Sequence, residues 1–111
     1  MNEWKHMYRV KVVWLTENEG GRRSAPPIGR YYPVSRFPEE KTDWQNNAWS
    51  VVFELEKPNV TDGRIVSMGC VQFLFDTAPE QWMTKYEAFE IYEGPRKVAD
   101  VSVSYTHLRA H

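Results

Sequence analysis

The chain has 111 residues, with 14 basic and 15 acidic side chains and a formal net charge of −1. This length suits one domain that is large enough to bury a core. The near-neutral charge excludes a chain-wide electrostatic signature of nucleic-acid binding. We therefore expect no DNA partner. The longest apolar run, residues 12–15, is far too short for a transmembrane helix, so we do not expect a membrane as a partner either.

Residues that could carry chemistry are few. The single cysteine, Cys70, excludes an internal disulfide and fits a reducing cytoplasm, where we place the protein. The sequence contains no P-loop, no Ser/His/Asp set and no cluster with metal-ligand spacing. His6 is the only histidine outside the last nine residues. We therefore expect a protein that is not an enzyme and that binds neither a cofactor nor a metal.

The first third of the chain contains two segments in which apolar and polar residues alternate, the pattern of a strand with one buried face. We expect residues 1–7 to be a flexible lead-in. The first strand is predicted over residues 8–15, and a long loop follows over residues 16–29. A second strand is predicted over residues 31–37, where Pro33 favours a sheet edge or a bulge.

The middle of the chain continues the pattern after a polar, turn-rich segment. Residues 48–55 predict a third strand, and residues 56–63 predict a hairpin-type turn. Residues 64–75 are long enough for two strands, or for one strand bent at Gly69. Within residues 76–87, the segment Ala78-Pro79-Glu80-Gln81-Trp82 predicts a single helical turn with Pro79 at its first position.

The segment over residues 88–101 predicts a hairpin. Alternation on both sides of Glu93-Gly94-Pro95 indicates two strands, and the Gly-Pro pair marks the turn between them. Short strands at this spacing predict an all-β sandwich or barrel and not a parallel sheet.

Two groups of residues, one near the start of the chain and one near its end, form an ordered pattern. The matching residues are Leu15, Thr16, Glu19, Gly20, Gly21, Arg22, Tyr31, Pro33, Phe89, Ile91, Glu93, Gly94, Arg96 and Val98. Over most of residues 8–101 the chain thereby resembles the C-terminal β-barrel domain of elongation factor Tu. The resemblance implies an all-β fold, a six-stranded antiparallel barrel of the translation-factor type, which we assign to residues 8–102.

In that family the barrel packs on a second barrel and helps to hold the T-stem of aminoacyl-tRNA. Carried over residue by residue, the resemblance places Arg22, Arg23, Glu93 and Gly94 at the tRNA contact. The chain departs from the family pattern in the segments 30–35 and 92–96, where it lacks arginines that the family has. A module that binds phosphates is expected to keep its cations.

Three functions remain open after these observations. We expect a standalone, non-enzymatic module that binds a protein partner, with an RNA-binding module and an enzyme of unrecognised type as alternatives. Four arginines lie in a stretch without acidic residues, and two tryptophans lie in turn regions where they would offer a stacking or docking surface. The candidate binding residues are Arg22, Arg23, Arg30, Arg36, Trp44, Trp82, Glu93 and Gly94.

The last nine residues, 103–111, match the translation of a transposase adapter used in preparing sequencing libraries. We interpret them as an adapter-derived tail on a gene fragment whose native sequence ends near Ser102. The first of these residues still alternate, so we expect them to be able to extend the last strand.

Overall fold

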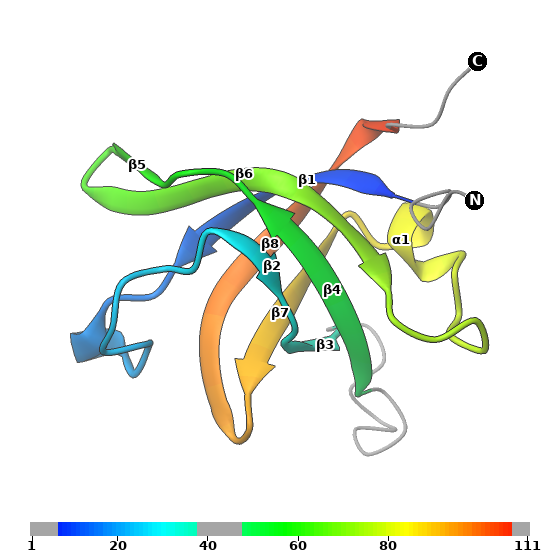
Figure 1. Ribbon diagram of the computed structural model, residues 1–111, viewed down its shortest axis with the longest axis horizontal. Coiled ribbons are helices and arrows are strands. Elements are labelled where there is room, and N and C mark those ends of the chain that lie inside the picture. Colours follow the sequence, from blue (N-terminus) through cyan, green and yellow to red (C-terminus); the bar gives the residue numbers. More distant parts are fainter. Residues whose placement is uncertain (1–6, 38–47, 108–111) are drawn as a thin grey trace.

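The computed structural model describes residues 7–37 and 48–107, and its strands close into an all-antiparallel β-barrel (Figure 1). The strands are β1 (Tyr8–Trp14), β2 (Gly29–Tyr31), β3 (Val34–Arg36), β4 (Trp49–Leu55), β5 (Asn59–Thr61), β6 (Arg64–Phe73), β7 (Ala88–Glu93) and β8 (Arg96–His107). One 3-10 helix, η1 (Glu17–Glu19), and one short α-helix, α1 (Trp82–Lys85), accompany them. The predicted fold class, an all-β barrel with six antiparallel strands, is confirmed.

The ring runs β1–β6–β4–β3–β7–β8 and returns to β1. β2 and β3 both pair with β4, with Tyr31 opposite Phe53 and Val34 opposite Ser50. The single strand expected over residues 31–37 is therefore interrupted beside Pro33, which has no N–H to donate to a ladder. The carbonyl of Pro33 still accepts a hydrogen bond from the Val51 N–H, at 3.1 Å.

Two further elements differ from the sequence-based expectation. The segment 56–63 is not all turn, because β5 lies within it and pairs with the first part of β6. Three residues are too few for alternation to be recognised in a sequence. β6 is one strand that runs through Gly69, and α1 begins at Trp82, at the end of the helical turn that was expected from Pro79.

The hairpin expected over residues 88–101 is present as β7 and β8. Its turn contains Gly94 at φ 61°, a left-handed conformation that glycine adopts at low cost. β8 continues beyond Ser102, with Val103 opposite Val10 and His107 opposite Tyr8. The strand thus includes the first five residues of the segment that we interpret as adapter-derived.

Alternate residues of the ring strands point into the barrel and form its core. Thirteen apolar residues of these strands are almost fully buried: Val10, Val12, Trp14, Val51, Phe53, Leu55, Val71, Phe73, Phe89, Ile91, Val98, Ala99 and Val101. Two serines on the same strands, Ser35 and Ser67, are also fully buried. The indole N–H of Trp14 donates to the buried hydroxyl of Ser67 at 2.8 Å, so that neither buried polar group lacks a partner.

One end of the barrel is closed by aromatic side chains, and we call it the aromatic end. The ring of Phe37 stacks on Phe89 at 4.8 Å between centroids and meets Trp82 of α1 edge-on at 5.4 Å. Met83, also on α1, is fully buried. The short helix therefore covers this end as an apolar plug, at the right of Figure 1.

Candidate binding site at the open end of the barrel

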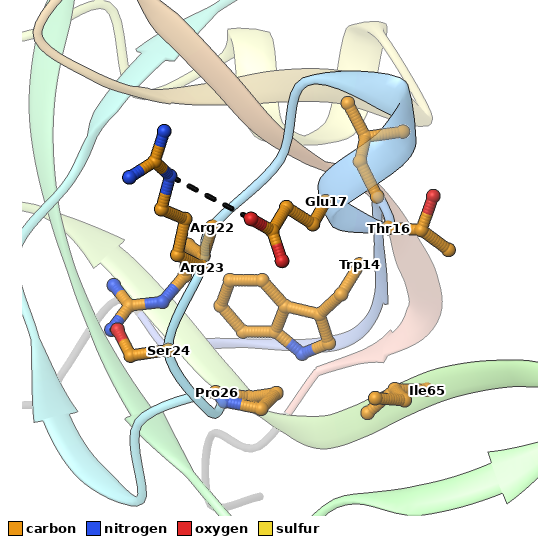
Figure 2. Close-up of a pocket in the computed structure, with 9 residues that line it drawn as sticks. Trp14, Thr16, Glu17, Arg22, Arg23, Ser24, Pro26 and Ile65 are labelled. Atoms are coloured by element: carbon orange, nitrogen blue, oxygen red, sulfur yellow. Dashed lines mark hydrogen bonds and ion pairs between the residues drawn. The ribbon is translucent and has the colours of Figure 1, made fainter.

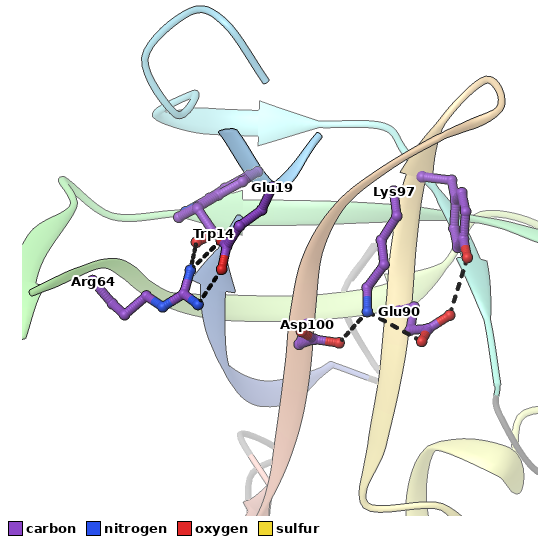
Figure 3. Close-up of polar contacts among 7 residues, drawn as sticks. Trp14, Glu19, Arg64, Glu90, Lys97 and Asp100 are labelled. Atoms are coloured by element: carbon purple, nitrogen blue, oxygen red, sulfur yellow. Dashed lines mark hydrogen bonds and ion pairs between the residues drawn. The ribbon is translucent and has the colours of Figure 1, made fainter. Parts of the chain in front are cut away.

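The loop after β1, residues 16–28, lies at the opposite end of the barrel, and we call it the rim loop (Figure 1). It opens with a capping box on η1: the Thr16 hydroxyl accepts from the Glu19 N–H at 3.2 Å, and the Glu19 carboxylate accepts from the Thr16 N–H at 2.8 Å. The same carboxylate receives both guanidinium nitrogens of Arg64 from β6, one of them at 2.6 Å (Figure 3). These hydrogen bonds, from Arg64 first and then from Thr16, lower the pKa of Glu19 to about 2.

The glycine pair of the rim loop brings the backbone back onto β1. Gly21 is buried, and a Cβ added to it would lie 2.5 Å from the carbonyl oxygen of Leu15. Only glycine fits such a close approach without displacing the backbone. The carbonyl of Gly21 accepts a hydrogen bond from Arg96 of β8 at 3.1 Å.

Arg22 turns inward beside the end of β7. Its guanidinium forms an ion pair with Glu93, and the Tyr31 hydroxyl donates to the same carboxylate oxygen. Burial, and next the neighbouring Glu93 carboxylate, raise the pKa of Tyr31, so the phenol stays protonated and keeps donating. Arg22 also donates to the Ser24 hydroxyl at 3.2 Å. The Arg22 side chain is only 20% exposed, because these partners surround it.

The two sequence groups that carry the resemblance therefore meet in space. Arg22 and Glu93 are 71 positions apart and form one ion pair, while Arg96 of the late hairpin holds the carbonyl of Gly21. Glu19, Gly21 and Arg22 thus fix the rim loop to β6, β8 and β7. These three residues therefore stabilise the position of the rim loop on the barrel.

A concavity of about 260 Å³ lies between the rim loop and the ends of β1 and β6, and we call it the mouth pocket (Figure 2). Apolar groups from Trp14, Leu15, Pro26 and Ile65 form much of its wall. Ile65 has the inward parity of β6 but lies beyond the closed core, so it is 42% exposed. Thr16, Glu17, Arg22, Arg23 and Ser24 complete the lining.

Arg23 is the most exposed cation of the pocket. Its side chain is 80% exposed and lies 3.7 Å from Glu17, which is itself 65% exposed (Figure 2). An ion pair between two such side chains contributes little to stability, because water screens it and both side chains lose freedom. Arg23 is therefore available to an incoming anion.

The other predicted arginines, Arg30 and Arg36, lie on strands and each has a partner of its own. Arg30 on β2 lies 3.4 Å from Glu54 of β4. Arg36 on β3 lies over the ring of Tyr92, at 5.6 Å from its centroid.

A polar cluster on β7 and β8 includes Tyr92, the residue whose ring lies under Arg36. The Tyr92 hydroxyl donates to Glu90 at 3.1 Å, and Lys97 bridges Glu90 and Asp100 at 3.2 and 2.9 Å (Figure 3). Opposite charges alternate along this pair of strands, which is a common way to stabilise an exposed sheet face.

Of the two tryptophans predicted to form a binding surface, the structure describes Trp82. Trp44 lies outside the described residues. Trp82 packs against Phe37 and Tyr86 at the aromatic end and is partly buried there. Trp82 therefore belongs to the apolar plug at the aromatic end and does not offer a fully exposed surface for stacking. Gly94 lies in the β7–β8 turn, next to Glu93 of the site.

Groups suited to catalysis are scarce in the part of the chain that the structure describes. Burial is the main cause that raises the pKa of the Cys70 thiol, which opposes formation of the reactive thiolate. Within the described ranges, no three His, Cys, Asp or Glu side chains are grouped so as to hold a metal ion. In the same ranges, no helix is long and apolar enough to cross a membrane.

The chain matches no protein-family model, and it matches none of the curated proteins.

Sequence reasoning missed most of the mouth pocket. Trp14, Pro26 and Ile65 carry no chemical motif. Arg64 was not singled out either, although it holds Glu19. One sequence feature could have pointed to Ile65. It alternates with the inward-facing residues of β6, which predicts that its side chain faces inward. Alternation does not predict that the closed core ends before Ile65.

Proposed function

We propose that this protein is a non-enzymatic β-barrel module that binds a protein partner in the cytoplasm through the open end of its barrel. The observation that supports this function most strongly is the mouth pocket. It combines an apolar wall with exposed charged groups at its edge, which is the composition of sites that receive a protein side chain. Val60, directly opposite Ile65 on β5, extends the exposed apolar surface beside it.

We further propose that the barrel is a distant relative of the C-terminal barrel of elongation factor Tu. Two features support this relationship. The chain forms a closed barrel of six antiparallel strands, and the two residue groups that carry the resemblance are in direct contact through Arg22 and Glu93.

A protein partner is favoured over RNA by the state of the arginines. Arg22 forms a partly buried ion pair with Glu93, so a phosphate would have to displace a carboxylate that is already well placed. Arg30 and Arg36 face other partners on other strands. A phosphate-binding surface needs several cations aligned along one backbone, so arginines that are paired with separate partners support a protein partner more than RNA.

The test is affinity capture by the full chain from a cytoplasmic lysate, with bound protein and bound RNA both identified at low and at high salt. We expect one or a few proteins that stay bound at high salt, since apolar contacts are not weakened by screening. The variant that probes the RNA alternative is Arg23→Glu, because Arg22 is needed to hold the rim loop to β7. Enrichment of RNA that disappears at high salt and in this variant would overturn the proposal, as would capture of nothing above the bead background.

A further inference from the structure

The size of the mouth pocket limits what can occupy it. Its volume of about 260 Å³ is below the roughly 300–1,000 Å³ of sites for drug-sized ligands. Such a space suits one large apolar side chain of a partner. Protein interfaces commonly obtain most of their binding energy from a few anchor residues of this kind, each seated in a pocket that excludes water.

The charges at the pocket edge indicate what should stand beside that anchor. The guanidinium of Arg22 is held by Glu93. Among the residues that the structure describes, that of Arg23 pairs only with Glu17, at 3.7 Å and exposed to water. A carboxylate of the partner can replace Glu17 at small cost, because the existing pair is weak. Once the apolar anchor excludes water nearby, the new pair becomes stronger than an exposed one.

We infer that the mouth pocket recognises an acidic peptide segment of the partner: one large aliphatic or aromatic side chain enters the pocket, and a neighbouring Asp or Glu pairs with Arg23. This inference rests on the proposed function and specifies its recognition element. Trp14 and Ile65 contact the anchor, and the outward guanidinium of Arg23 selects the charge next to it.

The test uses a random-peptide display library panned on the full chain, followed by titration of the best binder. We expect the enriched sequences to share a large apolar residue with an acidic residue within two positions. Ile65→Trp should weaken the selected peptide at least tenfold, since the indole occupies the cavity. Leu74→Trp is the matched control, because Leu74 has nearly the same exposure, 43% against 42%, but follows the other end of β6. Its affinity should equal that of the wild type.

The charge is tested separately. Arg23→Glu should weaken the peptide several-fold, and replacing the acidic residue of the peptide by lysine should restore affinity to that variant only. Arg9→Glu, at an exposed position on β1, is the control and should change nothing. Absence of the apolar–acidic pair among the enriched peptides, or binding unchanged by Ile65→Trp, would overturn the inference. If the wild type and Ile65→Trp capture the same protein equally from lysate, the protein does bind a protein partner, and the assignment of that binding to the mouth pocket is wrong.

Discussion

The two ends of the barrel are held together by different interactions. At the aromatic end, Phe37, Phe89 and the short helix α1 fill the space between strands with apolar groups. At the open end, the rim loop is fixed by Glu19 to Arg64 and by Arg22 to Glu93. Between these contacts lies the mouth pocket.

Because the two ends are held by different interactions, we expect them to contribute differently to stability and to binding. A close-packed apolar end leaves no room for a ligand but contributes strongly to the free energy of unfolding. A loop held by polar contacts can keep an apolar concavity open to water, because its shape does not depend on filling that space. We therefore expect substitutions at the aromatic end to affect stability, and substitutions in the mouth pocket to affect binding.

The largest effect is expected for Phe37→Ala at the aromatic end. Phe37 is fully buried and contacts the rings of Phe73, Phe89 and Trp82. Its truncation should lower the free energy of unfolding in urea by about 3–5 kcal/mol. The control is Phe75→Ala, whose side chain is 57% exposed and which should change stability by less than about 0.5 kcal/mol. Equal effects of the two substitutions would show that the aromatic end is not the stable end.

A smaller loss is expected for Gly21→Ala at the open end. The new methyl group would meet the Leu15 carbonyl, so the rim loop must move away from β1. We expect a loss of about 1–3 kcal/mol in urea unfolding, as for other overpacked sites. Ser24→Ala in the same loop should change stability by less than about 0.5 kcal/mol. A fully stable Gly21→Ala protein would mean that the loop is not held closely against β1.

Glu93→Gln tests the partly buried ion pair. The substitution keeps the shape but removes the charge that Arg22 and Tyr31 share. We expect a loss of about 1–3 kcal/mol, because hydrogen bonds to charged groups are worth more than neutral ones. Glu54→Gln makes the same change in the exposed pair with Arg30, where about 0–1 kcal/mol is expected. A larger effect at Glu54 than at Glu93 would contradict this ranking.

The smallest effect is expected for the pH dependence of Glu19. Its folded-state pKa of about 2 lies below the usual value for a glutamate, so ionised Glu19 favours the folded state. That contribution is complete above the unfolded pKa and is lost as the pH falls toward 2. In urea unfolding, wild type should be more stable than Glu19→Gln at pH 6, and the difference should shrink below about pH 4. A difference that is independent of pH would contradict the role of the ion pair.

Much of the fold follows from alternation in the sequence. The first strand, the strand over 49–55 and the β7–β8 hairpin could be predicted because each has enough residues to show period-two burial. Pro33 was expected to mark an edge or a bulge in one strand, whereas the structure has two strands, β2 and β3, on either side of it. β5 was missed because it has three exposed residues, and α1 was predicted slightly too early because its backbone first forms 3-10-type bonds.

The site could be predicted only in part. The resemblance placed Arg22 and Glu93 at one contact, and the structure brings them together. No local pattern predicts that they neutralise each other, since pairing over such a separation depends on barrel closure. The pocket depends in the same way on where the rim loop lies over Trp14 and Ile65, and that position is set by ion pairs that leave no periodic signal.

Hydrogen–deuterium exchange of the full chain, with and without its captured protein partner, tests most directly whether the open end is the binding end. We expect slower exchange on binding in the rim loop and in the β5–β6 hairpin around Ile65, with no change in residues 76–87 at the aromatic end. Protection confined to residues 76–87, with the rim loop unchanged, would contradict the assignment of binding to the mouth pocket.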